Sequence, residues 1–305
     1  MRMEPCDGDP MMPSMFEKII VLPQGKDPQQ PVLERAVLCA SRSAELTVLD
    51  IFYEPALEGY LGNREVYEPL RSRVLAERQQ YAEALAAALA TRGIDAVGKA
   101  VWAASREDAI EEYAKSREVD LVVAAPLDGG RGGLASSDWR LLSRCRAPVL
   151  IVRGSSARQY KHIVAAVDPF HAHAKPAALD ADILAAAAKL QAKTGAELTV
   201  LHCFDPPEFF RADARLAVRD SEFEGGRRAE LEALLNRAGL PVAAAKVVAG
   251  EPHSILHKMI EAGQADLIVM GALARGRVKD WVIGSTAERV LHRTQVDVLA
   301  VHPRP

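Results

Sequence analysis

The residues best suited to do chemistry lie in the second half of the chain, at the ends of two short apolar runs. Asp168 ends the run "HIVAAVD", and Gly271 ends the run "DLIVMG". Further along, Gly284, Ser285 and Thr286 stand where an amphipathic helix is predicted to begin. A helix N-terminus that carries a glycine and two hydroxyls offers free backbone N–H groups and a favourable dipole to a phosphate. Together these residues indicate a site for a phosphate or a nucleotide.

Positive charge accompanies this candidate site. Arg275, Arg277 and Lys279 lie between the two glycines. The stretch "GALARGRV" has two glycines at P-loop spacing, but Arg277 and Val278 stand where a P-loop has its lysine and its Ser or Thr. No GxGxxG motif follows the first apolar run of either half. Two common phosphate-binding motifs are therefore excluded.

A repeat in the sequence predicts the elements that would position these residues. The hexapeptide "AELTVL" occurs at residues 44–49 and again at residues 196–201. Around it, both halves alternate short β-branched apolar runs with amphipathic stretches, which specifies a doubly wound, Rossmann-like parallel sheet. The predicted fold is therefore α/β, with two tandem five-stranded parallel sheets and helices on both faces. Ligands bind beyond the carboxyl ends of such strands, where Asp168 and Gly271 fall.

The same alternation sets the expected boundaries. The expected divisions are a disordered tail over residues 1–15, a first domain over 16–153, a linker over 154–159 and a second domain over 160–303. In the first domain, helices are expected over residues 31–43 and 71–93. The corresponding helix after the first strand of the second domain is expected to end at Gly195, a residue type that commonly closes helices.

Composition limits the class of protein. The chain has 305 residues, of which 49% are apolar and 26% charged, and its net charge is −3. These values give no overall attraction to nucleic acid or to an anionic membrane. No apolar run reaches the ~18–20 residues that span a bilayer, and the four cysteines form no CxxC pair. We expect a cytoplasmic protein that binds neither nucleic acid nor membrane and keeps its thiols reduced.

The tandem halves, the segment "AVDP" and the pattern G-x2-A-x9-G-S-T resemble the universal stress protein family. The segment "SSDWRLLSRC" at residues 136–145 resembles the tandem subgroup called universal stress protein E. The resemblance implies an adenine nucleotide alpha hydrolase-like fold and binding of ATP, with magnesium. It places the phosphates at Gly271, Ala274, Gly284 and Ser285, and the adenosine part at Asp168. Arg275 and Thr286 are counted with this predicted cofactor-binding set.

The second half departs from the family pattern at two positions. Ala274 stands where the family has glycine, and Pro169 stands where a glycine commonly follows the aspartate. If position 274 needs a positive φ angle or a close approach of the phosphate, alanine weakens binding there.

The first half has lost the pattern more completely. Ala125 and Ala135 replace its two glycines, Asp128 falls opposite Ala274, and Gln24 replaces the aspartate. We therefore expect nucleotide binding only in the second half. An acid in a phosphate site would also repel the ligand.

Other functions compete with nucleotide binding. The chain could be a nucleotide-free scaffold, or it could hold an apolar ligand under the long segments over residues 52–69 and 203–220. A metal site would draw on His171, His173 and the neighbouring His202–Cys203 pair, but the spacing matches no common metal motif. No catalytic residues or resident metal are predicted, and any hydrolysis of ATP would be very slow.

The last apolar run of each half needs a partner. Residues 147–152 and 296–301 are apolar edges that must be covered. The family resemblance implies that the two runs meet, so that the domains pair within one chain. Further association into a homo-oligomer is left open by the sequence.

Overall fold

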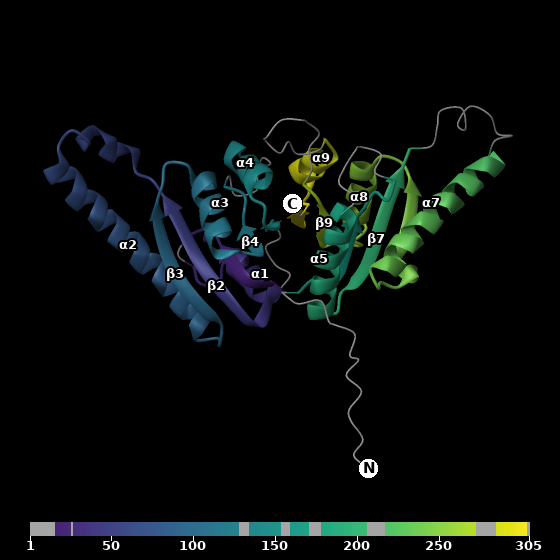
Figure 1. Ribbon diagram of the computed structural model, residues 1–305, viewed down its shortest axis with the longest axis horizontal. Helices are drawn as coiled ribbons and strands as arrows, with labels where there is room; N and C mark the ends of the chain where they lie inside the picture. The colour runs from purple at the N-terminus through teal and green to yellow at the C-terminus, as the bar shows by residue number, and fades with distance from the viewer. Residues whose placement is uncertain are drawn as a thin grey trace, which may run out of the picture.

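A computed structural model gives the architecture of the chain (Figure 1). The structure describes residues 16–25, 27–127, 134–153, 159–170, 178–205, 217–272 and 285–303. The predicted tail, all but the last residue of the predicted linker, and Ala274, Arg275 and Gly284 lie outside the described residues.

The first half alternates strands and helices from Phe16 to Ile151. Its elements are β1 (Phe16–Val21), α1 (Pro31–Cys39), β2 (Ala40–Phe52), the 3-10 helix η1 (Pro55–Tyr60), α2 (Arg64–Ala90), β3 (Asp95–Trp102), α3 (Arg106–Arg117), β4 (Leu121–Ala124), α4 (Ser136–Arg144) and β5 (Val149–Ile151).

The second half repeats this order. Its elements are β6 (His162–Ala166), α5 (Ala178–Thr194), β7 (Glu197–Phe204), α7 (Ala217–Arg237), the 3-10 helix η3 (Val242–Ala244), β8 (Ala245–Ala249), α8 (Pro252–Glu261), β9 (Leu267–Gly271), α9 (Ser285–Arg293) and β10 (Asp297–Val301). Gly195 follows α5 with a φ of 68°, as expected of a glycine that closes a helix.

All the strands belong to one ten-stranded sheet. The strand order is β3-β2-β1-β4-β5-β10-β9-β6-β7-β8, so each half has its first strand beside its fourth. Pairing is parallel within each half, and the halves join where β5 runs antiparallel to β10, with Leu150 opposite Leu299. The predicted fold class is confirmed, because each half is a doubly wound five-stranded unit.

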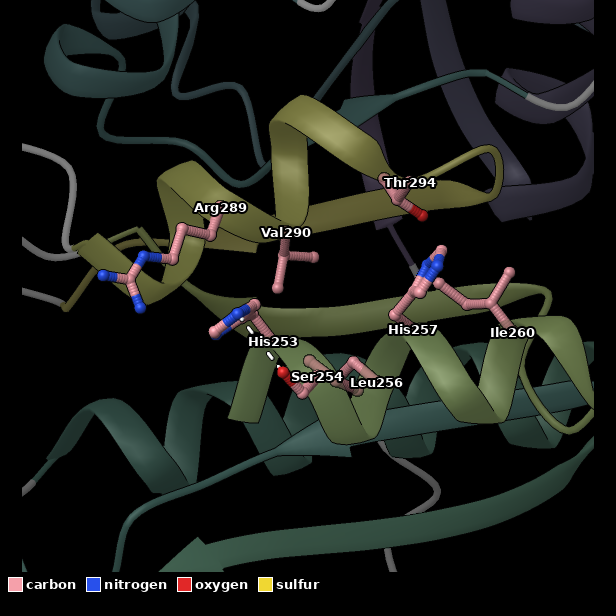
Figure 2. Close-up of a pocket in the computed structure, with 8 residues that line it drawn as sticks. All are labelled: His253, Ser254, Leu256, His257, Ile260, Arg289, Val290 and Thr294. Carbon is pink, nitrogen blue, oxygen red and sulfur yellow. Dashed lines mark hydrogen bonds between the residues drawn. The ribbon is translucent and has the colours of Figure 1, made fainter. Parts of the chain in front are cut away.

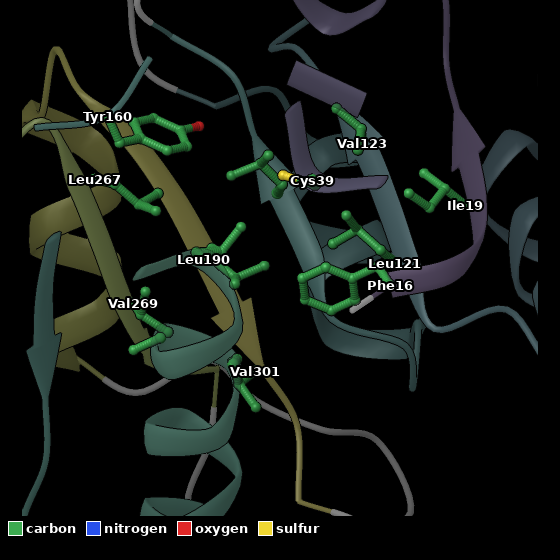
Figure 3. Packing of buried hydrophobic residues seen from close by; sticks show 14 of the residues in the cluster. Phe16, Ile19, Cys39, Leu121, Val123, Tyr160, Leu190, Leu267, Val269 and Val301 are labelled. Carbon is green, nitrogen blue, oxygen red and sulfur yellow. The ribbon is translucent and has the colours of Figure 1, made fainter. Parts of the chain in front are cut away.

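An apolar layer packs against each face of the sheet. One layer runs continuously across both halves, from Phe16 and Leu121 in the first to Leu190 and Val301 in the second (Figure 3). The other layer includes residues of α4 and α9, and the rings of Trp139 and His292 from these helices lie 5.3 Å apart.

A buried polar cluster joins the two halves. The carboxylate of Asp297, at the start of β10, accepts hydrogen bonds from Arg35 Nε on α1 (2.6 Å) and from the Tyr160 hydroxyl (2.8 Å). It also accepts one from the backbone N–H of Arg153 (2.8 Å). Arg35 is only 4% exposed and Asp297 1%. The Asp297 charge helps to raise the pKa of Tyr160 well above its ordinary value, after burial as the main cause. We call these residues the interdomain cluster.

Helix α2 covers the outer edge of β3. Gly98 of β3 lies so close to α2 that an added Cβ would stand 2.3 Å from the backbone carbon of Ala82. The Gln79 side chain donates to the carbonyl O of Gly98 (2.9 Å) and accepts from the backbone N–H of Ala100 (2.8 Å). An amide on the helix thus satisfies backbone groups that an edge strand would otherwise leave open to another chain.

Two helix boundaries differ from prediction. Helix α1 ends at Cys39 rather than at residue 43, and Ala40 is extended (ψ 140°) and pairs with Phe16. No glycine follows this helix as Gly195 follows α5, so the chain leaves it directly in the strand conformation. Helix α2 begins at Arg64 rather than at residue 71, with Pro69 in its second turn, where the missing N–H costs one hydrogen bond.

Candidate functional site

The predicted site residues that the structure describes meet at the carboxyl ends of two neighbouring strands. β6 and β9 are adjacent, with Ala166 opposite Met270. Asp168 follows β6 and Gly271 is the last residue of β9, so both stand at the edge where the chain reverses its strand order. Parallel doubly wound sheets bind ligands at this edge. The corresponding place in the first half lies between β1 and β4.

Asp168 is held by the helix that follows it. Its backbone N–H donates to Oδ1 of Asp180 (3.1 Å), a residue in the first turn of α5 that is 1% exposed. In the first half the backbone N–H of Gln24 donates in the same way to the side chain of Gln30, just before α1. The two halves therefore share a backbone arrangement, while the side chain at the strand end differs.

His202 lies beside Asp168 as a neutral imidazole. Its Nδ1 is 3.3 Å from the carbonyl O of Val167, which can only accept, and its Nε2 is 3.4 Å from Nη1 of Arg227, which can only donate. These partners place the proton on Nδ1. Burial lowers the pKa of His202, and the charge of Arg227 lowers it further. The Val167 carbonyl and the charges of Asp168 and Asp180 raise this pKa, but by less.

Arg227 and Phe170 form a wall next to this histidine. The Arg227 guanidinium carbon lies 3.9 Å from the ring centroid of Phe170 and 5.9 Å from that of Phe204. The Phe170 and His202 rings are 5.5 Å apart. The sequence had suggested His202 only as a metal ligand, and it gave no indication of Arg227, which lies on a helix distant in sequence. Among the described residues, no group of three or more His, Cys, Asp or Glu is placed to hold a metal; His171 and His173 lie outside them.

In the first half, side chains of the chain itself bind backbone groups at the equivalent strand ends. Gln24 Nε2 donates to the carbonyl O of Pro126 (2.8 Å), which ties the segment after β1 to the segment after β4. Asp138, the third residue of α4, is fully buried, and its Oδ2 accepts from the backbone N–H groups of Leu127 (3.2 Å) and Ala135 (3.0 Å). A carboxylate of the chain thus occupies the N-terminus of α4.

The second half has no carboxylate at that position. Aligning "SSDWRLLSRC" with "STAERVLHRT" places Ala287, the third residue of α9, opposite Asp138. The sequence indicated Gln24, Ala125, Ala135 and Asp128 as the cause of the loss of the first site, and Asp128 lies outside the described residues. Asp138 was not among these residues. The signal was present, since an acid at the third position of a helix commonly bonds back to the N–H groups before it.

Gly271 has a packing reason to be glycine. A Cβ there would lie 2.6 Å from Cδ2 of Leu179 on α5, a side chain that is 1% exposed. The glycine therefore gives no independent support for a phosphate site. Ser285 and Thr286 begin α9 as expected, although their side chains, like Ala274, Arg275 and Gly284, lie outside the described residues. The phosphate part of the site stays a prediction.

The family model of the universal stress protein family matches residues 15–153 and again residues 159–302. The chain belongs to the universal stress protein family. Two matched segments cover both structural halves, so this family member is a tandem protein.

Relatives of this universal stress protein are similar along nearly their whole length. It is 23% identical to the universal stress protein E homolog of Haemophilus influenzae, over 94% of this chain and 98% of that one. It is 24% identical to universal stress protein E of Escherichia coli, over 95% of each.

Solved structures share the fold. A protein of unknown function from Pseudomonas aeruginosa PAO1 superposes with a TM-score of 0.68 at 21% identity, covering 96% of this chain and 94% of that one. A universal stress protein from Archaeoglobus fulgidus gives a TM-score of 0.61 at 19% identity, covering 93% and 98%. No helix in the described part of the chain is long and apolar enough to cross a membrane.

Proposed function

We propose that this universal stress protein binds one adenine nucleotide, ATP or a close relative, at the carboxyl ends of β6 and β9, and serves as a cytoplasmic stress sensor. The observation that carries the proposal is the difference between the two strand-end crevices. Gln24 and Asp138 fill the first from within the chain. Asp168 and Ala287 stand at the same places in the second.

The Asp138 carboxylate shows what the N-terminus of this helix accepts. Its Oδ2 accepts hydrogen bonds from the backbone N–H groups of Leu127 and Ala135. Phosphates are bound by the same kind of groups, aided by the helix dipole. In the second half the methyl group of Ala287 brings no charge to that place, so an anion bound there would have to come from a ligand.

The residues around Asp168 suit the uncharged part of a nucleotide. A carboxylate can accept hydrogen bonds from ribose hydroxyls, and the family resemblance implies that Asp168 contacts the adenosine part. Phe170 is 38% exposed and offers a ring face beside it, with Arg227 behind that ring. Stacking on an aromatic face is a common way to hold a base.

The chemistry of such a site is binding rather than turnover. Magnesium would arrive on the phosphates of the nucleotide, since this ion usually keeps most of its waters and takes few protein ligands. Any hydrolysis of the nucleotide is expected to be very slow. A sensor needs only a difference in affinity between two states of the protein.

The test is a titration of the full chain with ATP in magnesium, comparing Ala287→Asp with Ala287→Asn. Aspartate there reproduces the arrangement of Asp138 and should weaken binding at least a hundredfold, because it repels the phosphate. The uncharged asparagine should weaken binding less. Equal binding by the aspartate variant would refute the site. An unchanged melting temperature would show that both variants fold.

A further inference from the structure

A groove lies between α8 and α9 (Figure 2). Its cavity volume is about 80 Å³, below the ~300–1,000 Å³ of typical ligand pockets, so it suits only a small ligand. Apolar and polar side chains alternate along both helices of its lining (Figure 2). The apolar ones are Leu256, Ile260 and Val290, and those that can donate hydrogen bonds are His253, Ser254, His257, Arg289 and Thr294. Such a lining fits a small ligand that has both an apolar part and an anionic group.

The first half shows which ligand group the groove lacks. Aligning "SREDAI" with "EPHSIL" places Glu107 of α3 opposite His253 of α8, and the alignment of α4 with α9 places Arg140 opposite Arg289. In the first half the pair is a salt bridge, with Arg140 Nη2 3.3 Å from Glu107 Oε1. Glu107 is only 4% exposed. The second half keeps the arginine and replaces its buried carboxylate with an imidazole.

Two of the groove's donors meet at a single carboxylate oxygen. Oε2 of Glu251 lies 3.3 Å from His253 Nδ1 and 3.7 Å from Arg289 Nη1. One carboxylate can therefore contact both the imidazole and the guanidinium. The Glu251 side chain is 63% exposed, and exposed pairs of this length contribute little to stability. A carboxylate arriving with its own apolar group can displace it.

We propose that the groove between α8 and α9 binds a short organic carboxylate. The carboxylate takes the place that Glu107 takes in the first half and is held by Arg289 and His253. Its apolar part lies on Leu256, Ile260 and Val290. His257 stands one turn further along α8, paired with the exposed Glu261 (3.2 Å). A planar guanidinium recognises carboxylates by paired hydrogen bonds, which favours this group over a neutral one.

The experiment is an NMR titration of the isotope-labelled full chain with benzoate and, as a matched neutral probe, benzamide. Benzoate should shift amide signals of α8 and α9, and benzamide should not. His253→Glu restores the internal ion pair of the first half and should weaken benzoate binding at least tenfold. Glu251→Gln removes the competing carboxylate and should strengthen benzoate binding a few fold. His162→Gln, a change at an exposed histidine on β6, should have no effect.

Three results would overturn the proposal. Equal shifts with benzamide would show that charge plays no part. Unchanged benzoate affinity in His253→Glu, with the melting temperature of the wild type, would show that the groove is not the site. Displacement of benzoate by saturating ATP would assign the signal to the strand-end site. The inference does not depend on the proposed nucleotide function, because benzoate and ATP are measured separately.

Discussion

Replacing Asp297 by Asn should destabilise the protein by more than any ordinary polar substitution. The change keeps the size of the side chain and removes its charge. It leaves the Arg35 guanidinium, whose side chain is 5% exposed, without the carboxylate 2.6 Å away. The perturbation acts where the two halves meet, since Arg35 lies on α1 and Asp297 on β10.

The magnitude follows from the burial of the pair. Breaking a buried ion pair by removing one partner costs about 3–5 kcal/mol, because the other charge stays in the protein interior. Asn keeps one oxygen that can still accept from the Arg153 backbone or the Tyr160 hydroxyl, so the lower end, about 3 kcal/mol, applies. That is a large share of the 5–15 kcal/mol typical of a folded protein. It corresponds to a fall in melting temperature of roughly 6–12 °C.

The assay is urea unfolding followed by circular dichroism, with Arg35→Met and the double variant as controls. The double variant removes both charges and should recover more than half of the loss, since no unpaired charge remains. A loss below about 1 kcal/mol for Asp297→Asn would refute the reasoning, because it would mean that Arg35 finds solvent or another anion at little cost.

Two further predictions concern packing and pH. Gly98→Ala should lower the unfolding free energy by roughly 2–3 kcal/mol, because the new methyl would meet the α2 backbone at Ala82. The control is Gly59→Ala, where an added Cβ would meet nothing within 4 Å. Equal losses of unfolding free energy in the two variants would contradict the close packing of α2 on Gly98. Burial lowers the pKa of His302, so the unfolded chain binds more protons below about pH 6.5 and stability falls as the pH drops through that region. His302→Gln should reduce the loss of unfolding free energy between pH 7 and 5, measured by urea unfolding, whereas the control His162→Gln should not. An unchanged pH dependence of stability in His302→Gln would contradict this prediction.

Much of the fold could be predicted from the sequence because strand and helix periods differ. "AELTVL" and "DLVVAA" are continuous apolar runs, and buried parallel strands have this pattern. The predicted end of α1 at residue 43 and the predicted start of α2 at residue 71 were wrong. Without a closing glycine, the end of α1 depends on the pairing of Ala40 with Phe16, which is a contact across the sheet. One proline near its start does not stop a helix whose later turns pack through Ala82, Leu85 and Leu89.

The site was predictable only where its residues follow strands. Asp168 and Gly271 could be placed because the ends of β6 and β9 follow from the strand pattern. The contact of Arg227 with Phe170 joins segments distant in sequence, and no spacing rule connects them. Asp138 was missed for a different reason. The sequence pointed to it only within the segment "SSDWRLLSRC", whereas its hydrogen bonds from the backbone N–H groups of Leu127 and Ala135 depend on how the chain returns from β4.

The measurement that tests the central claim most directly is the number of adenine nucleotides bound per chain, from calorimetric titration of the full protein with ATP in magnesium. The first half has Gln24 and Asp138 where the second has Asp168 and Ala287, and this difference predicts one nucleotide per chain. A value near two would show that the first half binds despite its own side chains in the crevice. No binding at millimolar ATP would contradict the nucleotide function and favour a nucleotide-free scaffold.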